Sequence, residues 1–443
     1  MTYSETKEYL ESFVNYEKHS SYPYKESLKL ERIKGFLDLL GNPERGLRCV
    51  HIAGTKGKGS TAAFIAYILR EAGFRTGLYT SPHLRDFRER IRILDPDFSL
   101  LAPGHDFEGM ISRGSLSRIA TRLKPVIQKY NRVSEFGPLT FFEAYTTIAF
   151  VYFKEKKVDF AVLETGLGGR LDATNAVDAL VSVITPISYE HTQKLGKTLR
   201  KIAGEKAGII KNPGLIVISA AQKKEAGDVI RKRCRLCRAK LYEAGRQIRF
   251  RKEKSGFAVR SFFGAHEGLR IQLLGRHQIE NAALSVAAVG ALSLHGAIIS
   301  SRAVKMGLRN ARWPGRCEVV AKNPVVILDG AQNTASAAAI KQAVRDNFKY
   351  RRLILVLGIS DDKDISGVCR QLYPLADEIV LTRANSSRAT DPKLLVKYFK
   401  GKRTHATKSV KEAKGLARRL ASKEDLVLVT GSLFVVGEFR ENE

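Results

Sequence analysis

The chain has 443 residues, of which 44% are hydrophobic, and this size and composition predict a globular protein of two or three domains. Its 75 Lys and Arg against 45 Asp and Glu give a formal net charge of +30, which raises the question of nucleic-acid binding. No apolar run is long enough to span a bilayer, the N-terminus lacks an apolar signal segment, and the five irregularly spaced cysteines argue against a disulfide framework. We therefore expect a cytoplasmic protein without a membrane partner.

The predicted elements begin with helices over residues 6–16 and 28–40. Residues 49–53 then form a short apolar strand, residues 54–61 a glycine-rich turn, and the following residues a helix with a recurring apolar face. A strand, a glycine loop and a helix are the context in which a phosphate loop works, because backbone N–H groups and the helix N-terminus attract an anion. The alternative is a glycine turn before a packing helix; the context favours a nucleotide site.

The side chains of this loop fit that interpretation. Lys58 would reach the β- and γ-phosphates of a nucleotide, and the Ser60 hydroxyl could meet a magnesium ion. The spacing departs from the strict GxxxxGK[ST] pattern, because Gly59 stands between the lysine and the hydroxyl.

The rest of the chain alternates between strands and helices. Strands are predicted over residues 76–80, 159–163, 179–185, 215–219, 325–328, 353–357, 378–382 and 426–429. Helices are predicted over residues 139–153, 198–207, 278–294 and 334–347, and after Pro392 and Ser409, with β-rich material over 241–275. Two βα-alternating blocks predict two parallel sheets covered by helices, with a break near residues 296–300.

Several polar residues lie where predicted strands end, which is where open α/β sheets bind ligands. Ser81 follows one strand, a glycine loop over residues 164–175 follows another, and Glu190 and His191 follow a third. Glu143 is a charge inside an apolar helix, which is costly unless it is paired or bound to a metal. Each of these features also has an ordinary structural explanation. Together with the phosphate loop they favour a metal–nucleotide site suited to magnesium or manganese.

The basic run over residues 231–240 has no interleaved aromatic residues and no nucleic-acid-reading motif. We interpret it as a solvated basic face and expect no nucleic-acid partner. Cys234 and Cys237 lie in this run, but no second CxxC or HxxxH pair completes a zinc site, so we interpret them as structural.

The chain also carries a family resemblance, which spans residues 20–437. The segments that carry it include HIAGTKGKGS, TSPHLRDFRERI, VLETGLGGRLDATN, GRHQIENAALS, WPGR and LDGAQN. In this order they resemble folylpolyglutamate synthase/dihydrofolate synthase, a branch of the Mur ligase superfamily. The resemblance implies a two-domain α/β fold, with an ATP- and pterin-binding P-loop domain over 1–297 and a Rossmann-like glutamate ligase domain over 298–443.

The family's chemistry is an ATP-dependent ligation. The γ-phosphoryl group of ATP passes to a substrate carboxylate, and the amine of glutamate attacks the acyl phosphate to form an amide. The resemblance assigns catalytic roles to Lys58, His191, Lys206 and Arg316. It assigns nucleotide contacts to Gly54, Thr55, Lys56, Gly57, Lys58, Gly59, Ser60, Asn281, Arg316 and Asp329. It assigns one magnesium site to Ser81 and Glu143 and a second to His191 and Lys206, with Glu143 shared by both sites and Lys206 carbamylated.

The chain departs from the family pattern at a few positions. Lys56 stands where the family usually has Asn, and Glu190 replaces an Asp before His191. Thr165 and Gln332 replace a usual Val and His. None of these changes removes a residue assigned to metal or phosphate.

The substrate is less closely specified. Residues 22–27, the loop after Ser81 and the surroundings of Glu143 are where a pterin would lie by analogy. We expect a monomer that adds glutamate to both dihydropteroate and folates. A Mur-type ligase acting on a nucleotide sugar is one alternative, although only 53 residues precede Gly54. A nucleic-acid-stimulated ATPase is the other.

Overall fold

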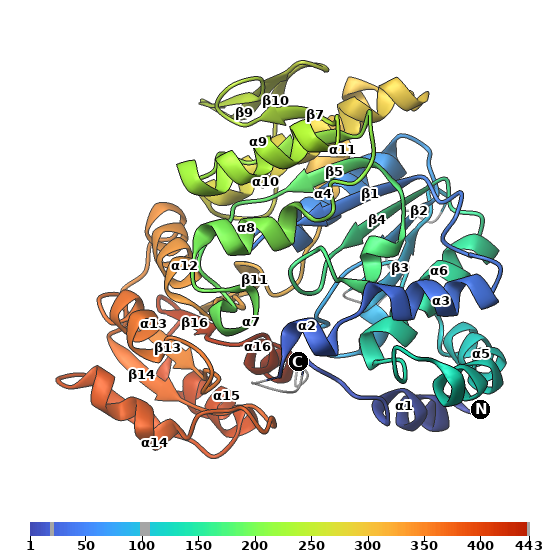
Figure 1. Ribbon diagram of the computed structural model, residues 1–443. Helices are drawn as coiled ribbons and strands as arrows, with labels where there is room; N and C mark the ends of the chain where they lie inside the picture. Colours follow the sequence, from blue (N-terminus) through green and yellow to red (C-terminus); the bar gives the residue numbers. More distant parts are fainter. Residues whose placement is uncertain (18–21, 98–106, 441–443) are drawn as a thin grey trace. The chain divides into compact units, whose positions relative to one another are not determined.

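The structure is a computed structural model that describes residues 1–17, 22–97 and 107–440. The chain divides into two compact units, each of which is described by itself (Figure 1). The first unit contains residues 1–83, 88–272 and 279–311, and the second contains residues 84–87, 273–278 and 312–443.

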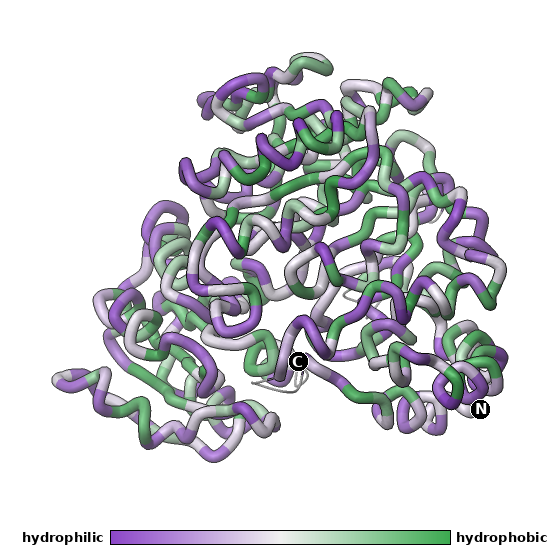
Figure 2. Tube along the Cα trace, viewed as in Figure 1, coloured by the Kyte–Doolittle hydropathy of each residue, from purple (hydrophilic) through white to green (hydrophobic). Residues whose placement is uncertain are grey.

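The first unit is built on a seven-stranded sheet with the strand order β3-β2-β4-β1-β5-β6-β7. Its strands are β1 (Cys49–Ala53), β2 (Thr76–Tyr79), β3 (Ile91–Leu94), β4 (Phe160–Glu164), β5 (Ala179–Ile184), β6 (Ile216–Ser219) and β7 (Lys240–Glu243). All neighbours are parallel except β2 and β3. Every residue of β1 and β4 is buried, so both faces of the sheet are covered, as expected for parallel strands. Figure 2 shows this apolar character along the strands.

Helices flank this sheet. They are α1 (Tyr3–Glu11), α2 (Tyr24–Ser27), α3 (Leu30–Leu39), α4 (Lys58–Glu71), α5 (Arg113–Val133), α6 (Phe141–Glu155), α7 (Thr192–Leu195), α8 (Leu199–Ala207), α9 (Lys224–Leu236), α10 (Arg276–Ala291) and α11 (Ser301–Asn310). Short 3₁₀ turns η1 (Phe87–Arg90), η2 (Ala173–Ala176) and η3 (Leu292–His295) complete the described helical segments. The small sheet β10-β9-β8 follows β7, with β8 (Arg249–Glu253), β9 (Gly256–Ser261) and β10 (Gly264–Leu269).

The first unit extends past the boundary predicted at residue 297, to Ala311. Helix α11 is the reason, because it packs directly on α4. A Cβ atom added at Gly307 of α11 would lie 2.4 Å from Cα of Ile68 in α4, so the two backbones are in close contact. The sequence shows an Ala-rich helix ending before residue 297, but it does not show which sheet the next helix covers.

The second unit is a six-stranded sheet with the order β11-β12-β16-β13-β14-β15. Its strands are β11 (Glu318–Lys322), β12 (Val325–Leu328), β13 (Leu353–Leu357), β14 (Glu378–Leu381), β15 (Arg403–Ala406) and β16 (Leu426–Thr430). Its helices are α12 (Thr334–Asn347), α13 (Ile365–Leu372), α14 (Pro392–Leu395), η4 (Val396–Phe399), α15 (Val410–Leu420) and α16 (Leu433–Arg440). Only β11 runs antiparallel to its neighbour among these described strands, so the predicted Rossmann-like architecture is confirmed.

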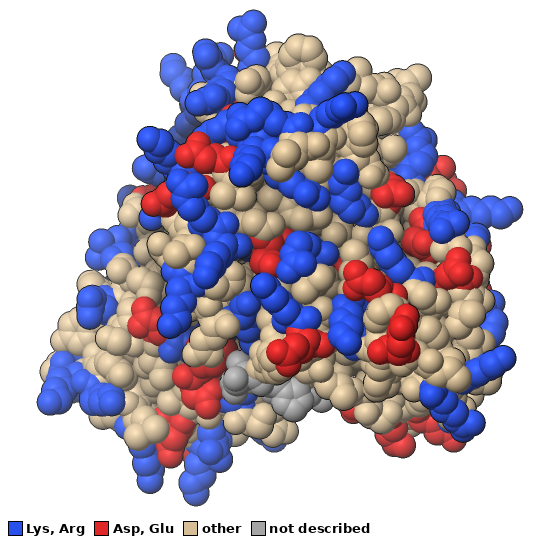
Figure 3. All heavy atoms as spheres, in the orientation of Figure 1, with Lys and Arg blue, Asp and Glu red and all other residues tan. Residues whose placement is uncertain are grey.

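The basic run of the sequence lies largely on α9. Ala226, Gly227, Ile230 and Cys234 face the core, and the arginines and lysines alternate with them toward solvent. Figure 3 shows Lys and Arg over most of the face drawn, interspersed with Asp and Glu. All five cysteines are free, and the Cys237 thiol donates to the carbonyl oxygen of Ile210 at 3.2 Å. No described helix combines the length and apolarity needed to cross a bilayer.

Candidate functional site

The glycine loop between β1 and α4 has the backbone that a phosphate loop requires. Gly57 caps α4 in the left-handed region, with φ 84°, and Gly54 has φ 155°. A Cβ at Gly54 would lie 1.8 Å from Oγ1 of Thr185, and one at Gly57 would lie 2.3 Å from Oδ1 of Asn281. Both positions therefore exclude any side chain, for conformational and for steric reasons.

The strand order brings the predicted polar residues to one edge of the sheet. Strands β2, β4, β1 and β5 are successive parallel neighbours. Their carboxyl ends carry Ser81, Glu164, Gly54 and the segment over residues 186–191, in that spatial order. The clustering at strand ends that the sequence predicted is thus present in the fold.

Glu164 lies at the centre of this edge. Its side chain is 6% exposed, its Oε1 is 3.8 Å from Nζ of Lys58, and its Oε2 accepts a hydrogen bond from the Ser81 backbone N–H at 3.2 Å. A buried carboxylate between a phosphate-loop lysine and a strand-end serine is well placed to bind a hard cation. The sequence analysis did not assign it a role, although it is the last residue of a buried strand and the first of the glycine loop.

Glu143, which the sequence analysis assigned to both metal sites, has a different environment. Nε of Arg32 donates to both carboxylate oxygens at 2.9 Å, and the N–H and hydroxyl of Thr140 both donate to Oε2 at 2.8 Å. The Arg32 and Glu143 side chains are each 6% exposed. The carboxylate is thus used by a buried ion pair and by the capping box of α6. These contacts favour a structural role for Glu143 over the metal-ligand role that the resemblance implied.

Lys206 lies at the end of α8 and is buried directly behind the glycine loop. Its Nζ donates to the carbonyl oxygen of Gly54 at 2.7 Å, and the residue is 5% exposed. Burial is the main cause that lowers the pKa of Lys206 to about 7, and the positive charge of Lys58 lowers it further. The amine is therefore partly neutral near pH 7, whereas an ordinary lysine is fully charged.

The segment over residues 186–191, which follows β5, lies against the glycine loop. Nζ of Lys56 is 2.6 Å from Oε1 of Glu190, and the backbone N–H of Thr55 donates to the carbonyl oxygen of Pro186 at 3.0 Å. Burial raises the pKa of Glu190, but Lys56 and its other cationic neighbours outweigh burial and hold this pKa at about 2. His191 follows in the left-handed region with φ 50° and precedes α7. The structure therefore brings Lys56, Lys58, Lys206 and Glu190 together around the loop.

The remaining residues that the resemblance assigns to the nucleotide fall in both units. Asn281 is 2% exposed and lies against Gly57 within the first unit. Asp329 belongs to the second unit, where its carboxylate accepts from the N–H groups of Cys317 at 2.8 Å and Ala331 at 2.9 Å. Burial raises the pKa of Asp329 and the charge of Arg316 opposes this, so these two residues are neighbours in the second unit.

The region where the resemblance places a pterin contains aromatic and charged side chains. The Tyr22 ring lies 4.0 Å from Nζ of Lys194. Arg90 is 1% exposed, pairs with Glu17 at 2.6 Å and donates from Nε to Nδ1 of His83 at 2.9 Å. Arg90 is thus already bonded through its guanidinium to Glu17 and His83, and each of its three guanidinium nitrogens has a partner within the protein.

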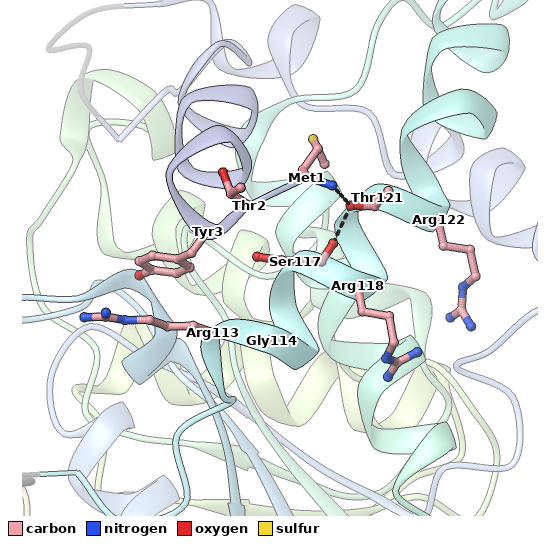
Figure 4. A pocket seen from close by; sticks show the side chains of 9 residues that line it. All are labelled: Met1, Thr2, Tyr3, Arg113, Gly114, Ser117, Arg118, Thr121 and Arg122. Carbon is pink, nitrogen blue, oxygen red and sulfur yellow. Dashed lines mark hydrogen bonds between the residues drawn. The ribbon is translucent and has the colours of Figure 1, made fainter.

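A separate hollow lies between α1 and α5 (Figure 4). It is lined by Met1, Thr2, Tyr3, Arg113, Gly114, Ser117, Arg118, Thr121 and Arg122. The terminal amine of Met1 donates to Oγ1 of Thr121 at 2.8 Å inside it. It shares no residue with the glycine loop or the strand ends, so we do not assign the reaction to it.

No three His, Cys, Asp or Glu side chains form a metal-binding cluster within residues 1–17, 22–97 and 107–440. A metal site at the glycine loop would therefore need ligands of other kinds, such as the Ser81 hydroxyl, a modified lysine and the phosphates themselves.

Comparison with known proteins shows that two family models match this chain. The Mur ligase middle domain matches residues 126–289, and the Mur ligase glutamate ligase domain matches residues 315–433.

Full-length relatives agree with the two models. A dihydrofolate synthase/folylpolyglutamate synthase from Bacillus subtilis is 34% identical over 429 residues, covering 93% of this chain and 94% of the relative. A structure of Mycobacterium tuberculosis folylpolyglutamate synthase complexed with ADP and AMPPCP superposes with a TM-score of 0.84 at 31% identity, over 95% of this chain and 96% of that one. The structure of E. coli FolC in complex with DHPP and ADP gives 0.85 at 30% identity, over 100% and 97%.

Proposed function

The chain belongs to the dihydrofolate synthase/folylpolyglutamate synthase family of Mur ligases, and from this premise we propose that it adds L-glutamate both to dihydropteroate and to folates. It is an ATP-dependent ligase that joins glutamate to folates. The dual specificity is supported by the double name of the Bacillus subtilis relative and by the complex of E. coli FolC with DHPP and ADP. A ligase for nucleotide sugars and a nucleic-acid-stimulated ATPase are not favoured.

The observation that carries the proposed mechanism is the convergence of two lysines and a carboxylate on the glycine loop. Lys58 begins α4, Lys206 bonds to Gly54, and Glu164 lies 3.8 Å from Lys58. Residues 54–60 would bind the phosphates of ATP through backbone N–H groups and the Lys58 ammonium. Positioning and charge neutralisation of this kind are what phosphoryl transfer to a substrate carboxylate requires.

The residues at this edge of the sheet fit magnesium. We assign Ser81 and Glu164 to one site and His191 and Lys206 to a second, with Glu164 in the place that the sequence analysis gave to Glu143. Oxygen donors with one imidazole are ligands that magnesium accepts. When bound, magnesium would neutralise the charge that develops on the transferring phosphoryl group.

The environment of Lys206 supports the proposed carbamate. A neutral amine can attack the carbon of CO₂, forming an N–C bond and releasing one proton, so that the product carries one negative charge. With a pKa of about 7, Lys206 supplies the neutral amine without extreme pH. The carbamate nitrogen keeps one N–H, so the hydrogen bond to the Gly54 carbonyl can persist while the new oxygens face a cation.

For Asn281, Arg316 and Asp329 we propose the nucleotide-binding roles that the resemblance implies, with Arg316 neutralising phosphate charge. The partners that we propose are small molecules, namely ATP, L-glutamate and a pteroate or folate, and the active form that we propose is a monomer without nucleic acid.

A side-by-side assay tests the substrate assignment. Glutamate-dependent ADP release is measured with dihydropteroate and with tetrahydrofolate at equal enzyme concentration. We expect release with both acceptors. Release with only one acceptor would contradict the dual specificity, and release stimulated by polynucleotide but not by either acceptor would contradict the ligase assignment.

A further inference from the structure

The segment over residues 186–191, which we call the connecting segment, is tied to the glycine loop by its backbone. The N–H groups of Thr55 and Lys56 both donate to the carbonyl oxygen of Pro186, at 3.0 and 3.3 Å. The Thr55 hydroxyl donates to the carbonyl oxygen of Ser188 at 3.2 Å, and the Ser188 N–H donates to the Thr55 hydroxyl at 3.1 Å. These bonds fix residues 186–188 against the loop.

The second half of the connecting segment is held by a side-chain ion pair. Nζ of Lys56 lies 2.6 Å from Oε1 of Glu190, and the two side chains are 31% and 15% exposed. The next residue, His191, has φ 50°, in the left-handed region that residues other than glycine rarely adopt. Such a conformation persists only when the surrounding contacts fix it. The Lys56–Glu190 ion pair is one such contact, because Glu190 directly precedes His191.

The neighbouring lysines have other partners, which distinguishes Lys56 from them. Lys58 pairs with Glu164 at 3.8 Å, and Lys206 donates to the Gly54 carbonyl at 2.7 Å. Both of these contacts lie within the edge formed by β4, β1 and the loop. The contact from Lys56 instead reaches the segment that carries His191.

We propose that Lys56 and Glu190 form a positioning pair that holds the connecting segment, and with it His191, against the glycine loop. The inference rests on the proposed function, in which His191 is a metal ligand.

The competing explanation is that Lys56 simply binds a phosphate and that Glu190 is an incidental counter-charge. The two explanations differ in what removal of Glu190 does. A positioning pair loses its function when either member is neutralised, whereas a phosphate-binding lysine that is freed from a counter-charge binds ATP more tightly.

The test is a double-mutant cycle with Lys56→Met, Glu190→Gln and the double variant, which remove charge and keep side-chain size. Asp178→Asn is the control, because Asp178 is 79% exposed, pairs with Lys211 at 3.6 Å and precedes β5, at the opposite end of that strand from the connecting segment. Two quantities are measured: amide hydrogen exchange of residues 187–191 in protein free of metal and nucleotide, and kcat/KM for ATP at saturating magnesium.

We expect about tenfold faster exchange in the connecting segment and about tenfold lower kcat/KM in each single variant, with no further loss in the double. The control should match the unchanged protein in both measurements.

Three results would overturn the positioning pair: unchanged exchange in both single variants, losses that multiply to about a hundredfold in the double, or tighter ATP binding in Glu190→Gln. The exchange measurement is independent of the reaction. An enzyme that ligates glutamate to neither acceptor would therefore contradict the proposed function. The hydrogen-exchange result would still show whether Lys56 and Glu190 hold the connecting segment.

Discussion

Comparing the same substitution at two glutamates, Glu143 and Glu164, gives the sharpest test of the site. Glu143→Gln and Glu164→Gln remove the same charge from carboxylates that are both about 6% exposed. The structure predicts opposite consequences. Glu143 pairs with Arg32 in the interior, whereas Glu164 lies 3.8 Å from Lys58, where we propose that it binds magnesium.

The cost at Glu143 follows from its partner. Loss of one member of a buried ion pair typically destabilises a protein by about 3–5 kcal/mol, because the other charge stays buried without compensation. The Gln oxygen can still accept from the Thr140 N–H, so we expect about 3 kcal/mol. Urea denaturation should report this loss, and glutamate-dependent ADP release at a temperature where the variant is folded should stay near normal.

The effect at Glu164 is on the reaction. Gln can still accept from the Ser81 N–H, so the strand end keeps its hydrogen bond. The lost carboxylate removes a proposed magnesium ligand, and we expect ADP release to fall by about 10²-fold or more with a small change in urea midpoint. An active Glu164→Gln, or an inactive Glu143→Gln of normal stability, would refute the reasoning.

Four further predictions follow from the same geometry. Lys58→Met should abolish ADP release and leave the circular dichroism spectrum unchanged, because Lys58 supplies charge rather than core packing; near-normal turnover would remove it from the mechanism. Arg316→Ala should lower kcat by about 10²–10³-fold without a change in melting temperature; an equal loss of both would indicate a structural role. Lys206→Ala should be inactive and partly rescued by acetate, and full activity without acid would contradict the carbamate. With a pKa of about 7, Lys206 is about one-tenth neutral at pH 6 and about nine-tenths neutral at pH 8, so the initial rate of ¹³CO₂ uptake by metal-free protein at fixed dissolved CO₂, followed by NMR, should rise about tenfold; the rise of about a hundredfold that an ordinary lysine gives would contradict the lowered pKa.

Local signals were enough to predict the glycine loop and most of the strands. Gly54 and Gly57 adopt backbone conformations that suit glycine, and the buried strands are mostly apolar runs of four to six residues. The strands are not uniformly apolar, since they include His51, Glu164 and Ser182, but enough of their residues are apolar for the runs to be recognised from residues close in the chain. The alternation of strands and helices likewise predicted both sheets.

Features that depend on distant partners were missed. The boundary after Ala311 depends on how α11 packs on α4, and hydrophobic periodicity carries no information about that contact. Helix α5 was also not predicted, although its buried residues Leu116, Ile119 and Leu123 recur at helical spacing, so this was a local signal that the sequence analysis overlooked.

The roles of Glu143 and Glu164 also depend on distant partners that the sequence does not show. A lone carboxylate in an apolar helix has the same appearance in sequence whether it binds metal or pairs with an arginine. Arg32, the partner of Glu143, lies 111 residues away, and the cost of burying either charge alone makes that pairing decisive. Glu164 is adjacent in space to Ser81 and Lys58 only because β2, β4 and β1 are neighbours in the sheet. The sequence by itself determined that a phosphate loop and strand-end polar residues are present; the strand order and the ion pairs determined which carboxylate faces the loop.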